Sequence, residues 1–248
     1  MAKHPANDNG AAVLDGLRVA ITGGTSGLGL ALVRTLDARG ARVAFCARTA
    51  ARVAEVAREL PRTHGIVADV SHKDAIYPLA MQFTSALDGL DVLVNNASAL
   101  GPVPLASLAD TECEDLEHAL ATNLVAPFRL TRALLGALAA SARERGGAVV
   151  VNVSSDAAIN PYPNWGAYGA SKAALVHLTH IWREELAEEG FRFIAFDPGD
   201  MDTPLHALAI PGADTRTLRH PEDAAHELVA RIVEALAGAR TSAAGALA

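Results

Sequence analysis

A glycine-rich turn between an apolar run and an amphipathic stretch is the feature that most constrains how this chain folds. The apolar residues 17–21 lead directly into Thr-Gly-Gly-Thr-Ser-Gly-Leu-Gly at residues 22–29, where a helical pattern begins. Gly23 suits the turn, Gly27 a close approach of the backbone to a pyrophosphate, and Gly29 tight packing of helix on strand. The first turn of such a helix also offers unpaired N–H groups to an anion. Glycines in a turn also occur for packing alone, but this arrangement is typical of a dinucleotide site. The residues predicted for it are Gly23, Thr25, Ser26, Gly27, Leu28 and Gly29.

Short apolar runs alternate with longer amphipathic stretches along the rest of the chain, which is the pattern of parallel strands joined by crossover helices. The predicted strands are residues 18–21, 42–46, 65–68, 92–94, 148–153 and 192–196. We therefore expect an α/β fold with a doubly wound parallel sheet of the Rossmann-like kind, in a single domain over residues 16–248. Residues 1–15 are small and polar, and we expect them to form a disordered leader.

Composition and charge narrow the class of protein. The chain has 248 residues, half of them hydrophobic, which is ample for one large core. A formal net charge of -7 without a basic run argues against nucleic acid or an anionic membrane as a partner. Cys46 and Cys113 lack the spacing of a metal site, and neither a signal peptide nor a stretch of about twenty apolar residues stands out. We expect a cytoplasmic protein with a small-molecule partner and no metal, in which Asp200 and Asp202 face water.

Tyr168 and Lys172 are four residues apart in a helical stretch, so their side chains share one face. A neighbouring ammonium favours phenolate, and we expect it to lower the pKa of Tyr168 from about 10 toward the working pH. The alternative is a core tyrosine beside a solvated lysine. Ser155 favours the first interpretation, because it lies where the valine-rich strand ends and α/β sheets place their ligands there. Ser154 is expected to point the other way and to be structural.

The spacing Gly-x-x-x-Gly-x-Gly at the turn, together with Tyr-x-x-x-Lys at residues 168–172, resembles the short-chain dehydrogenase/reductase family of the compact, single-domain kind. Matching motifs run from Gly23 to Thr203. The resemblance implies an NAD(P)-dependent oxidoreductase that interconverts a ketone or aldehyde and an alcohol by hydride transfer, with Tyr168 as acid and base. In the family, the equivalent of Ser155 polarises the carbonyl, and the equivalent of Asn123 holds a water that links Lys172 to solvent. The catalytic residues so implied are Asn123, Ser155, Tyr168 and Lys172. Asn123 also fits a buried asparagine that bonds helix backbone.

Asn-Asn-Ala-Ser at residues 95–98 matches the family's Asn-Asn-Ala-Gly, with Ser98 in place of the glycine. If the backbone at Ser98 needs a positive φ, serine costs about 1 kcal/mol there. We interpret Asn95 as a structural link between strands. Thr203 matches a nicotinamide contact of the family and, before a proline, is equally a good helix N-cap. The further cofactor contacts that the resemblance implies are Asp69, Val70, Asn96, Ala97, Tyr168, Lys172, Pro198, Gly199, Met201 and Thr203.

The end of the second predicted strand bears on which nicotinamide cofactor is bound. A carboxylate there would bond the ribose hydroxyls of NAD, but the chain has Arg48 and Thr49 instead. A planar guanidinium suits a 2′-phosphate. NADP(H) is therefore the expected cofactor and NAD(H) the alternative, while a solvated Arg48 is the competing interpretation. Arg52, one helical turn further, is open to the same two interpretations.

The substrate region and the assembly follow from the remaining segments. Tyr162 and Trp165 precede the tyrosine motif and suit either a cleft wall or a subunit contact. Met201, Leu205 and His206 are candidates for the opposite wall. The C-terminal part reads as one amphipathic helix over residues 221–236 followed by alanine-rich sequence, so the family's seventh strand is expected to be absent or short. We accordingly expect a homodimer through the central long helices.

Two rival functions are weaker. A non-catalytic NADP-binding regulator on the same fold would not need Ser155, Tyr168, Lys172 and Asn123 together. A serine hydrolase would need a Gly-x-Ser-x-Gly turn, which the chain lacks.

Overall fold

The computed structural model describes residues 14–245, with side chains as far as residue 238. Its described part contains a six-stranded, wholly parallel sheet in the order β3-β2-β1-β4-β5-β6. The strands are β1 (Arg18–Thr22), β2 (Arg42–Ala47), β3 (His64–Val67), β4 (Val92–Asn95), β5 (Ala148–Val153) and β6 (Phe191–Phe196). Strand order reverses between β1 and β4, which opens a crevice at the carboxyl ends of these two strands. The fold is thus the doubly wound α/β sheet expected.

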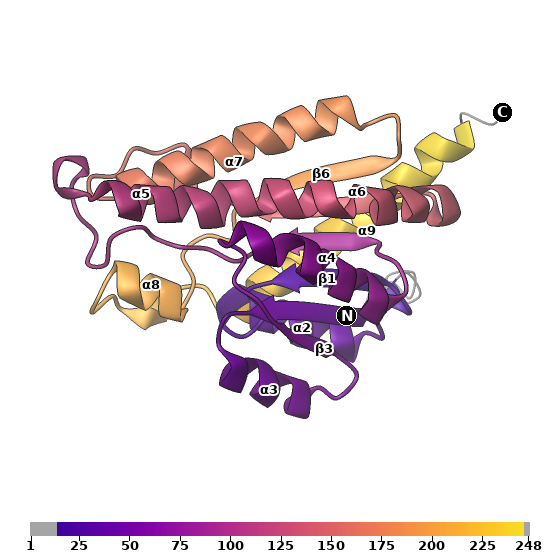
Figure 1. Cartoon of the computed structure of the whole chain (residues 1–248), viewed down its shortest axis with the longest axis horizontal. Helices are drawn as coiled ribbons and strands as arrows, with labels where there is room; N and C mark the ends of the chain where they lie inside the picture. Colours follow the sequence, from indigo (N-terminus) through magenta and orange to yellow (C-terminus); the bar gives the residue numbers. More distant parts are fainter. Residues whose placement is uncertain (1–13, 246–248) are drawn as a thin grey trace, which may run out of the picture.

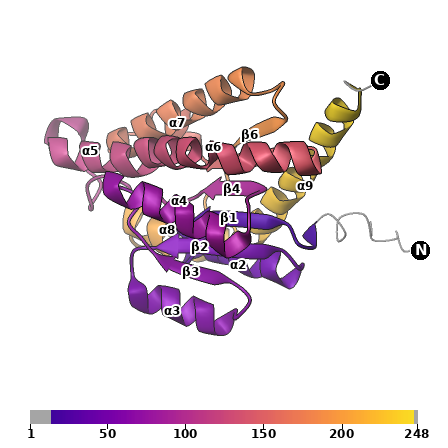
Figure 2. The same ribbon diagram turned by 45° about the vertical axis from the view of Figure 1, so that its right-hand side comes forward.

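Helices cover both faces of the sheet, as Figures 1 and 2 show. They are α2 (Gly27–Ala38), α3 (Ala50–Glu59), α4 (Lys73–Leu87), α5 (Cys113–Leu120), α6 (Ala126–Arg145), α7 (Gly166–Glu185), α8 (Pro204–Ala209) and α9 (Pro221–Gly245). A π-helical segment, η2 (Ala121–Val125), joins α5 to α6, and the short 3-10 turns are η1 (Leu108–Asp110), η3 (Asp156–Ala158) and η4 (Thr215–Thr217). Helices α4 and α6 pack side by side over one face of the sheet, and α2 and α9 pack over the other.

Side chains along each strand point alternately to the two faces of the sheet and so build the two halves of the core. In β1, Val19 and Ile21 pack with α2 and α9, while Ala20 between them packs with α4 and α6. All six residues of β5 are buried, because helices cover this central strand on both faces. Two-sided burial explains why the central strands β4 and β5 are mostly apolar.

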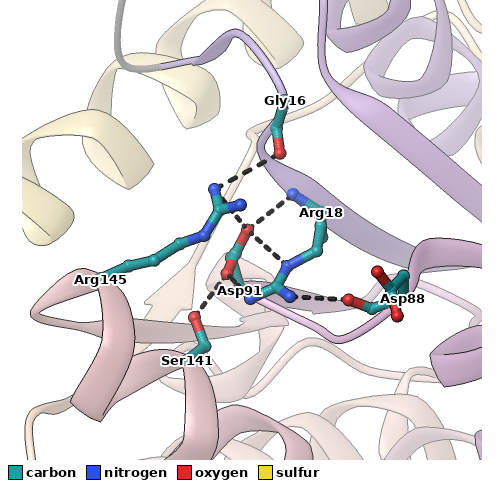
Figure 3. A network of polar contacts seen from close by, with 6 residues as sticks. All are labelled: Gly16, Arg18, Asp88, Asp91, Ser141 and Arg145. Carbon is teal, nitrogen blue, oxygen red and sulfur yellow. Dashed lines mark hydrogen bonds and ion pairs between the residues drawn. The ribbon is translucent and has the colours of Figure 1, made fainter.

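A buried ion pair fastens the end of the sheet that lies away from the carboxyl ends of the strands (Figure 3). Arg18, the first residue of β1, donates to the Asp91 carboxylate from Nε at 3.1 Å and from Nη2 at 2.7 Å. The same carboxylate accepts a 2.5 Å hydrogen bond from Ser141 Oγ on α6. Arg145 Nη1 lies 3.4 Å from Asp91 Oδ2 and also donates to the Gly16 carbonyl at 3.4 Å. The network therefore joins β1, α6 and the segment before β4.

The structure differs from the sequence-based expectations at the chain's N-terminal end and in the bounds of one strand and one helix. The predicted leader includes Leu14, but the Leu14 side chain is buried in the core with α2 and β1, so that boundary is wrong; residues 1–13 lie outside the described residues. The third strand begins at His64, one residue earlier than predicted. The expected absence of a seventh strand agrees with the six strands found between residues 14 and 245, while α9 extends beyond residue 236 to Gly245.

One helical run is longer and more apolar than the sequence analysis recognised. Residues 113–145, covering α5, η2 and α6, meet the length and composition of a membrane-spanning helix. On α6, the inward side chains of Leu130, Leu134 and Leu138 pack against the sheet. A helix whose apolar stripe covers a sheet passes the same test, so the run by itself indicates no membrane.

Candidate active site

The carboxyl ends of the strands surround a cavity of about 650 Å³. Loops that follow β1, β2, β3, β4, β5 and β6 all contribute to its wall. Every residue predicted to contact the cofactor lines this cavity except Gly29, and three of the four predicted catalytic residues line it, Asn123 being the exception. The topology thus brings together residues from Gly23 to Thr203 that are far apart in the sequence.

The glycine-rich turn has the geometry that its sequence predicts. Gly23 has a φ of +72°, and the amides of Gly23 and Gly24 both donate to the Cys46 carbonyl, at 2.8 and 3.1 Å. A Cβ atom on Gly29 would lie 2.1 Å from the Gly23 carbonyl oxygen, so Gly29 serves packing and not the cavity wall. Helix α2 begins at Gly27 with no side-chain cap from Ser26, which leaves its first turn directed at the cavity. An unpaired first turn suits a phosphate group.

Asparagines after β4 hold the turn and the sheet. The Asn96 side chain donates to the carbonyls of Thr22 and Gly23 at 2.9 and 3.1 Å, so it fastens the glycine turn besides lining the cavity. Sequence reasoning missed this second task. Asn95 donates to Asn152 Oδ1 at 2.8 Å and therefore links β4 to β5, as expected.

Lys172 and Tyr168 meet on the inner face of α7. Lys172 Nζ lies 5.6 Å from the centroid of the Tyr168 ring and donates to the Val153 carbonyl at 2.7 Å. Both side chains are buried. Burial raises the pKa of Tyr168 to about 12, although hydrogen bonds to Ser155 and Ser98 act in the opposite direction. Burial likewise lowers the pKa of Lys172 to about 8.

The sequence analysis expected the lysine to lower the pKa of Tyr168, and in this structure the direction is the reverse. The reason is desolvation, which favours the neutral form of both groups and, at Tyr168, outweighs the hydrogen bonds that favour the phenolate.

Ser155 lies beside Tyr168 as predicted. Its hydroxyl lowers the pKa of Tyr168, donates to Asp156 Oδ1 at 3.1 Å and accepts from the Ala157 amide at 3.2 Å. Ser154 also lines the cavity, which the alternation argument did not foresee, because the strand ends before this pair. Of the two serines, only Ser155 lowers the pKa of Tyr168.

Ser98 is a polar neighbour of Tyr168 to which the sequence analysis gave no role. Its φ is outside the positive region, so serine in place of glycine strains nothing here. The Ser98 hydroxyl donates to Asn123 Oδ1 at 3.2 Å and lowers the pKa of Tyr168.

Asn123 is fully buried in the π-helical segment, a type of distortion frequent at functional sites. Its Oδ1 accepts from the Ala99 amide at 2.8 Å and from Ser98, and its Nδ2 donates to the Ala99 carbonyl and to Ser171 Oγ, both at 2.8 Å. These four bonds use the whole capacity of the side-chain amide. The Asn123 side chain therefore holds protein groups together and has no position left for the water implied by the resemblance.

The two ends of the cavity differ in charge and polarity. At one end, exposed Arg48 and Thr49 follow β2, and Arg52 donates to the Thr25 carbonyl at 3.3 Å. Asp69 nearby accepts two hydrogen bonds from Ser71.

Aromatic and apolar side chains line the other end. Trp165 packs edge-on against Tyr168 with ring centroids 5.6 Å apart, and the Tyr162 hydroxyl donates to Asp156 Oδ2 at 2.7 Å. Thr203 caps α8 by accepting from the His206 amide at 3.2 Å. The predicted wall residues Met201, Leu205 and His206 are all present, together with Leu100, Leu208, Ala209 and Ile210, which sequence reasoning missed.

The residues fit a dinucleotide. Thr122 lines the cavity, and its buried hydroxyl has no hydrogen-bond partner among the described residues, which suits contact with a polar ligand. The uncapped start of α2, the arginines after β2 and this hydroxyl together supply anion and polar contacts along one cavity. Within residues 14–245, no three His, Cys, Asp or Glu side chains form a group that could hold a metal.

Fold and site together define an α/β oxidoreductase with a dinucleotide cavity and a serine, tyrosine and lysine set at the carboxyl end of its sheet. The model of the short chain dehydrogenase family matches residues 18–212. The chain belongs to this family.

Relatives and solved structures agree. A short-chain type dehydrogenase/reductase of Sinorhizobium fredii is 35% identical over 79% of this chain, which spans only 34% of that protein's length. Serine 3-dehydrogenase of Agrobacterium fabrum is 34% identical over 78% of this chain and 76% of its own. The 3-ketoacyl-(acyl-carrier-protein) reductase of Brucella melitensis, solved with NADH, has a TM-score of 0.79 at 28% identity, covering 87% of this chain and 90% of its own. A short chain dehydrogenase of Burkholderia cenocepacia, solved with NADP, has a TM-score of 0.78 at 29% identity, covering 89% and 91%.

Proposed function

We propose that this protein is an NADPH-dependent reductase of a ketone or aldehyde, with Tyr168 as the acid. The observation that carries the proposal is the meeting of two hydroxyl groups beside one buried cation. Ser155 and Tyr168 line the same cavity wall, Ser155 lowers the pKa of the Tyr168 phenol, and the Lys172 ammonium lies 5.6 Å from the Tyr168 ring centroid. A carbonyl oxygen that accepts from both hydroxyls is held and polarised at once, which assists proton transfer to it.

Each of the four residues then has one task. Bound NADPH supplies the hydride to the carbonyl carbon. Ser155 donates a hydrogen bond to the carbonyl oxygen, and Tyr168 gives its phenolic proton to the same oxygen, so that an alcohol and a phenolate result. The Lys172 charge favours that phenolate. Asn123 holds the loop after β4 against α7 through Ala99 and Ser171.

The preference for NADPH over NADH is proposed from the end of β2. Arg48 lines the cavity, and no ion pair or hydrogen bond from its guanidinium to another described residue competes for it. Arg52 lies on the same wall and contacts Thr25 of the glycine turn. The segment that follows β2 begins with Arg48 and Thr49 and carries no carboxylate to bond the free ribose hydroxyls of NADH. NADP in the Burkholderia relative supports this choice, and NADH in the Brucella relative keeps NAD(H) as the alternative.

Titration of NADPH and NADH into wild-type protein and Arg48→Ala, followed by calorimetry, tests the cofactor. Wild-type protein is expected to bind NADPH more tightly, and Arg48→Ala to bind NADPH about tenfold or more weakly with NADH unchanged, because a charge-assisted bond is lost. Arg58→Ala on the outer side of α3 is the matched control, since Arg58 only bonds its own helix. Equal affinity of Arg48→Ala and wild type for NADPH would contradict the assignment.

We also propose a cytoplasmic homodimer that acts on a small-molecule substrate. Large apolar side chains are exposed on the outer faces of α4, α6 and α7, among them Tyr77, Met81, Phe128 and Ile181. Apolar residues clustered on long helices are typical of subunit contacts. Gel filtration with light scattering is expected to give twice the chain mass, and a stable tetramer or a monomer would contradict the proposal.

A further inference from the structure

Ser98 has contacts that the four proposed catalytic residues do not explain. It follows β4 in the loop at the cavity wall and is half-buried. Its hydroxyl donates to Asn123 Oδ1 at 3.2 Å, and Ser98 lines the same cavity as Tyr168 and lowers the pKa of the Tyr168 phenol. Tyr168 therefore has two serine neighbours, one from the loop after β5 and one from the loop after β4.

The place of the Ser98 hydroxyl is fixed by the bonds around it. Asn123 binds both the amide and the carbonyl of Ala99 at 2.8 Å, which holds the backbone next to Ser98. Asn123 also donates to Ser171 Oγ at 2.8 Å, and Ser171 Oγ donates to the Tyr168 carbonyl at 2.7 Å. This closed set of contacts ties the Ser98 loop to the turn of α7 that carries Tyr168.

One hydroxyl proton can serve two acceptors in turn. While Tyr168 is a neutral phenol, Ser98 donates to Asn123, and the lone pairs of the Ser98 hydroxyl remain open to a donor. Once Tyr168 has given up its proton, rotation about one bond lets Ser98 donate to the phenolate instead. A hydrogen bond to a charged acceptor is stronger than one to a neutral amide, so the second arrangement is favoured as the charge develops.

We propose that Ser98 is a positioning residue for Tyr168, whose hydroxyl holds the phenol in place and donates to the phenolate that proton transfer leaves behind. This role rests on the proposed function of Tyr168. The charged groups around the phenol also affect how readily it ionises. Lys172 lies on α7 beneath the ring, while the carboxylates of Asp156 in η3 and Asp197 after β6 oppose the phenolate.

The test compares the pH dependence of alcohol oxidation by NADP⁺ in wild type, Ser98→Ala and Ser98→Thr. Oxidation needs the phenolate, so kcat rises with pH. Ser98→Ala is expected to move the midpoint of the kcat–pH curve upward by about one pH unit. At pH values below the midpoint its kcat is expected to be about tenfold lower than that of wild type, with the Kd for NADP⁺ unchanged. Ser98→Thr keeps the hydroxyl and is expected to have the wild-type midpoint and the wild-type kcat. Thr215→Ala, at an exposed position of η4 outside the cavity, is the control. An unchanged midpoint and kcat in Ser98→Ala would overturn the proposal, as would loss in Ser98→Thr equal to that in Ser98→Ala.

A second readout separates this proposal from the proposed function. Tyrosinate absorbance of the NADP⁺ complex, with the Tyr168→Phe signal subtracted, reports ionisation of Tyr168 among the three tyrosines without any substrate. A higher titration midpoint in Ser98→Ala supports the role of Ser98 even if no alcohol is oxidised, in which case only the proposed function fails. Identical curves for Ser98→Ala and wild type refute the role of Ser98.

Discussion

The ammonium group of Lys172 donates to the Val153 carbonyl at 2.7 Å in a fully buried setting. Within residues 14–238 no carboxylate forms an ion pair with it. Burial without a counter-charge lowers the pKa of this lysine to about 8. A lysine in this setting destabilises the folded protein, which is expected where a residue serves a reaction and not packing.

Replacing Lys172 by methionine is therefore expected to stabilise the cofactor-free protein by about 3 kcal/mol at pH 7. Below pH 8 the lysine is charged in both states, and the burial cost is fully present. Between about pH 8 and its ordinary pKa the folded state is already neutral while the unfolded chain is still protonated, so wild-type stability rises with pH. Denaturant unfolding at several pH values measures the difference between variant and wild type, which is expected to shrink as pH rises.

Variant and wild type must be compared at each pH, because the contribution of Cys46 to stability changes with pH in the opposite direction. Burial raises the pKa of its thiol to about 12, so its contribution falls as pH rises above its ordinary value. Arg58→Met, at an exposed position of α3, is the control and is expected to leave the pH dependence unchanged. A Lys172→Met protein that is less stable than wild type at pH 7 would contradict the account.

Asp91→Ala is expected to destabilise the fold by about 3–5 kcal/mol, because it leaves the buried Arg18 guanidinium without its partner. Replacing both residues by apolar ones, as in Arg18→Met with Asp91→Leu, is expected to recover most of that loss. Urea denaturation measures both. The exposed pair Arg34 and Glu59 is the control, and its loss is expected to cost about 1 kcal/mol or less. A mild effect of Asp91→Ala alone would contradict the role given to this network.

Two glycines in helices are expected to respond in opposite directions to alanine. Gly29→Ala brings a methyl group to within 2.1 Å of the Gly23 carbonyl oxygen. The variant is expected to lose about 1–3 kcal/mol of folding stability and to bind the dinucleotide more weakly. Gly136→Ala on α6 meets no atom within 4 Å and is expected to gain about 0.5–1 kcal/mol through helix propensity. Thermal unfolding with and without NADPH measures both, and similar effects of the two changes would contradict the packing argument.

The strands and the glycine turn could be predicted because they depend on local patterns. Strand β5 matches its predicted bounds since burial on both faces leaves five apolar residues out of six, Asn152 being the exception. Tyr168 and Lys172 meet because spacing along one helix fixes which side chains share a face.

Other features depend on contacts between distant residues. Arg18 and Asp91 are 73 positions apart, and no local pattern marks them as partners. Leu14 lies in a segment of mostly small and polar residues, so its burial has no periodic signal. The direction of the Tyr168 pKa could not be predicted either, because desolvation depends on how closely Trp165 and the surrounding loops cover the phenol.

Turnover by Tyr168→Phe tests the central claim most directly. The variant keeps the ring that packs against Trp165 and removes only the hydroxyl next to Ser155 and Ser98. Reduction of a panel of ketones and aldehydes with NADPH is measured for wild type and variant, with NADPH affinity determined alongside. Tyr168→Phe is expected to lose about a thousandfold or more in kcat while its Kd for NADPH stays nearly unchanged. Wild-type turnover in Tyr168→Phe would show that another group supplies the proton and would contradict the account.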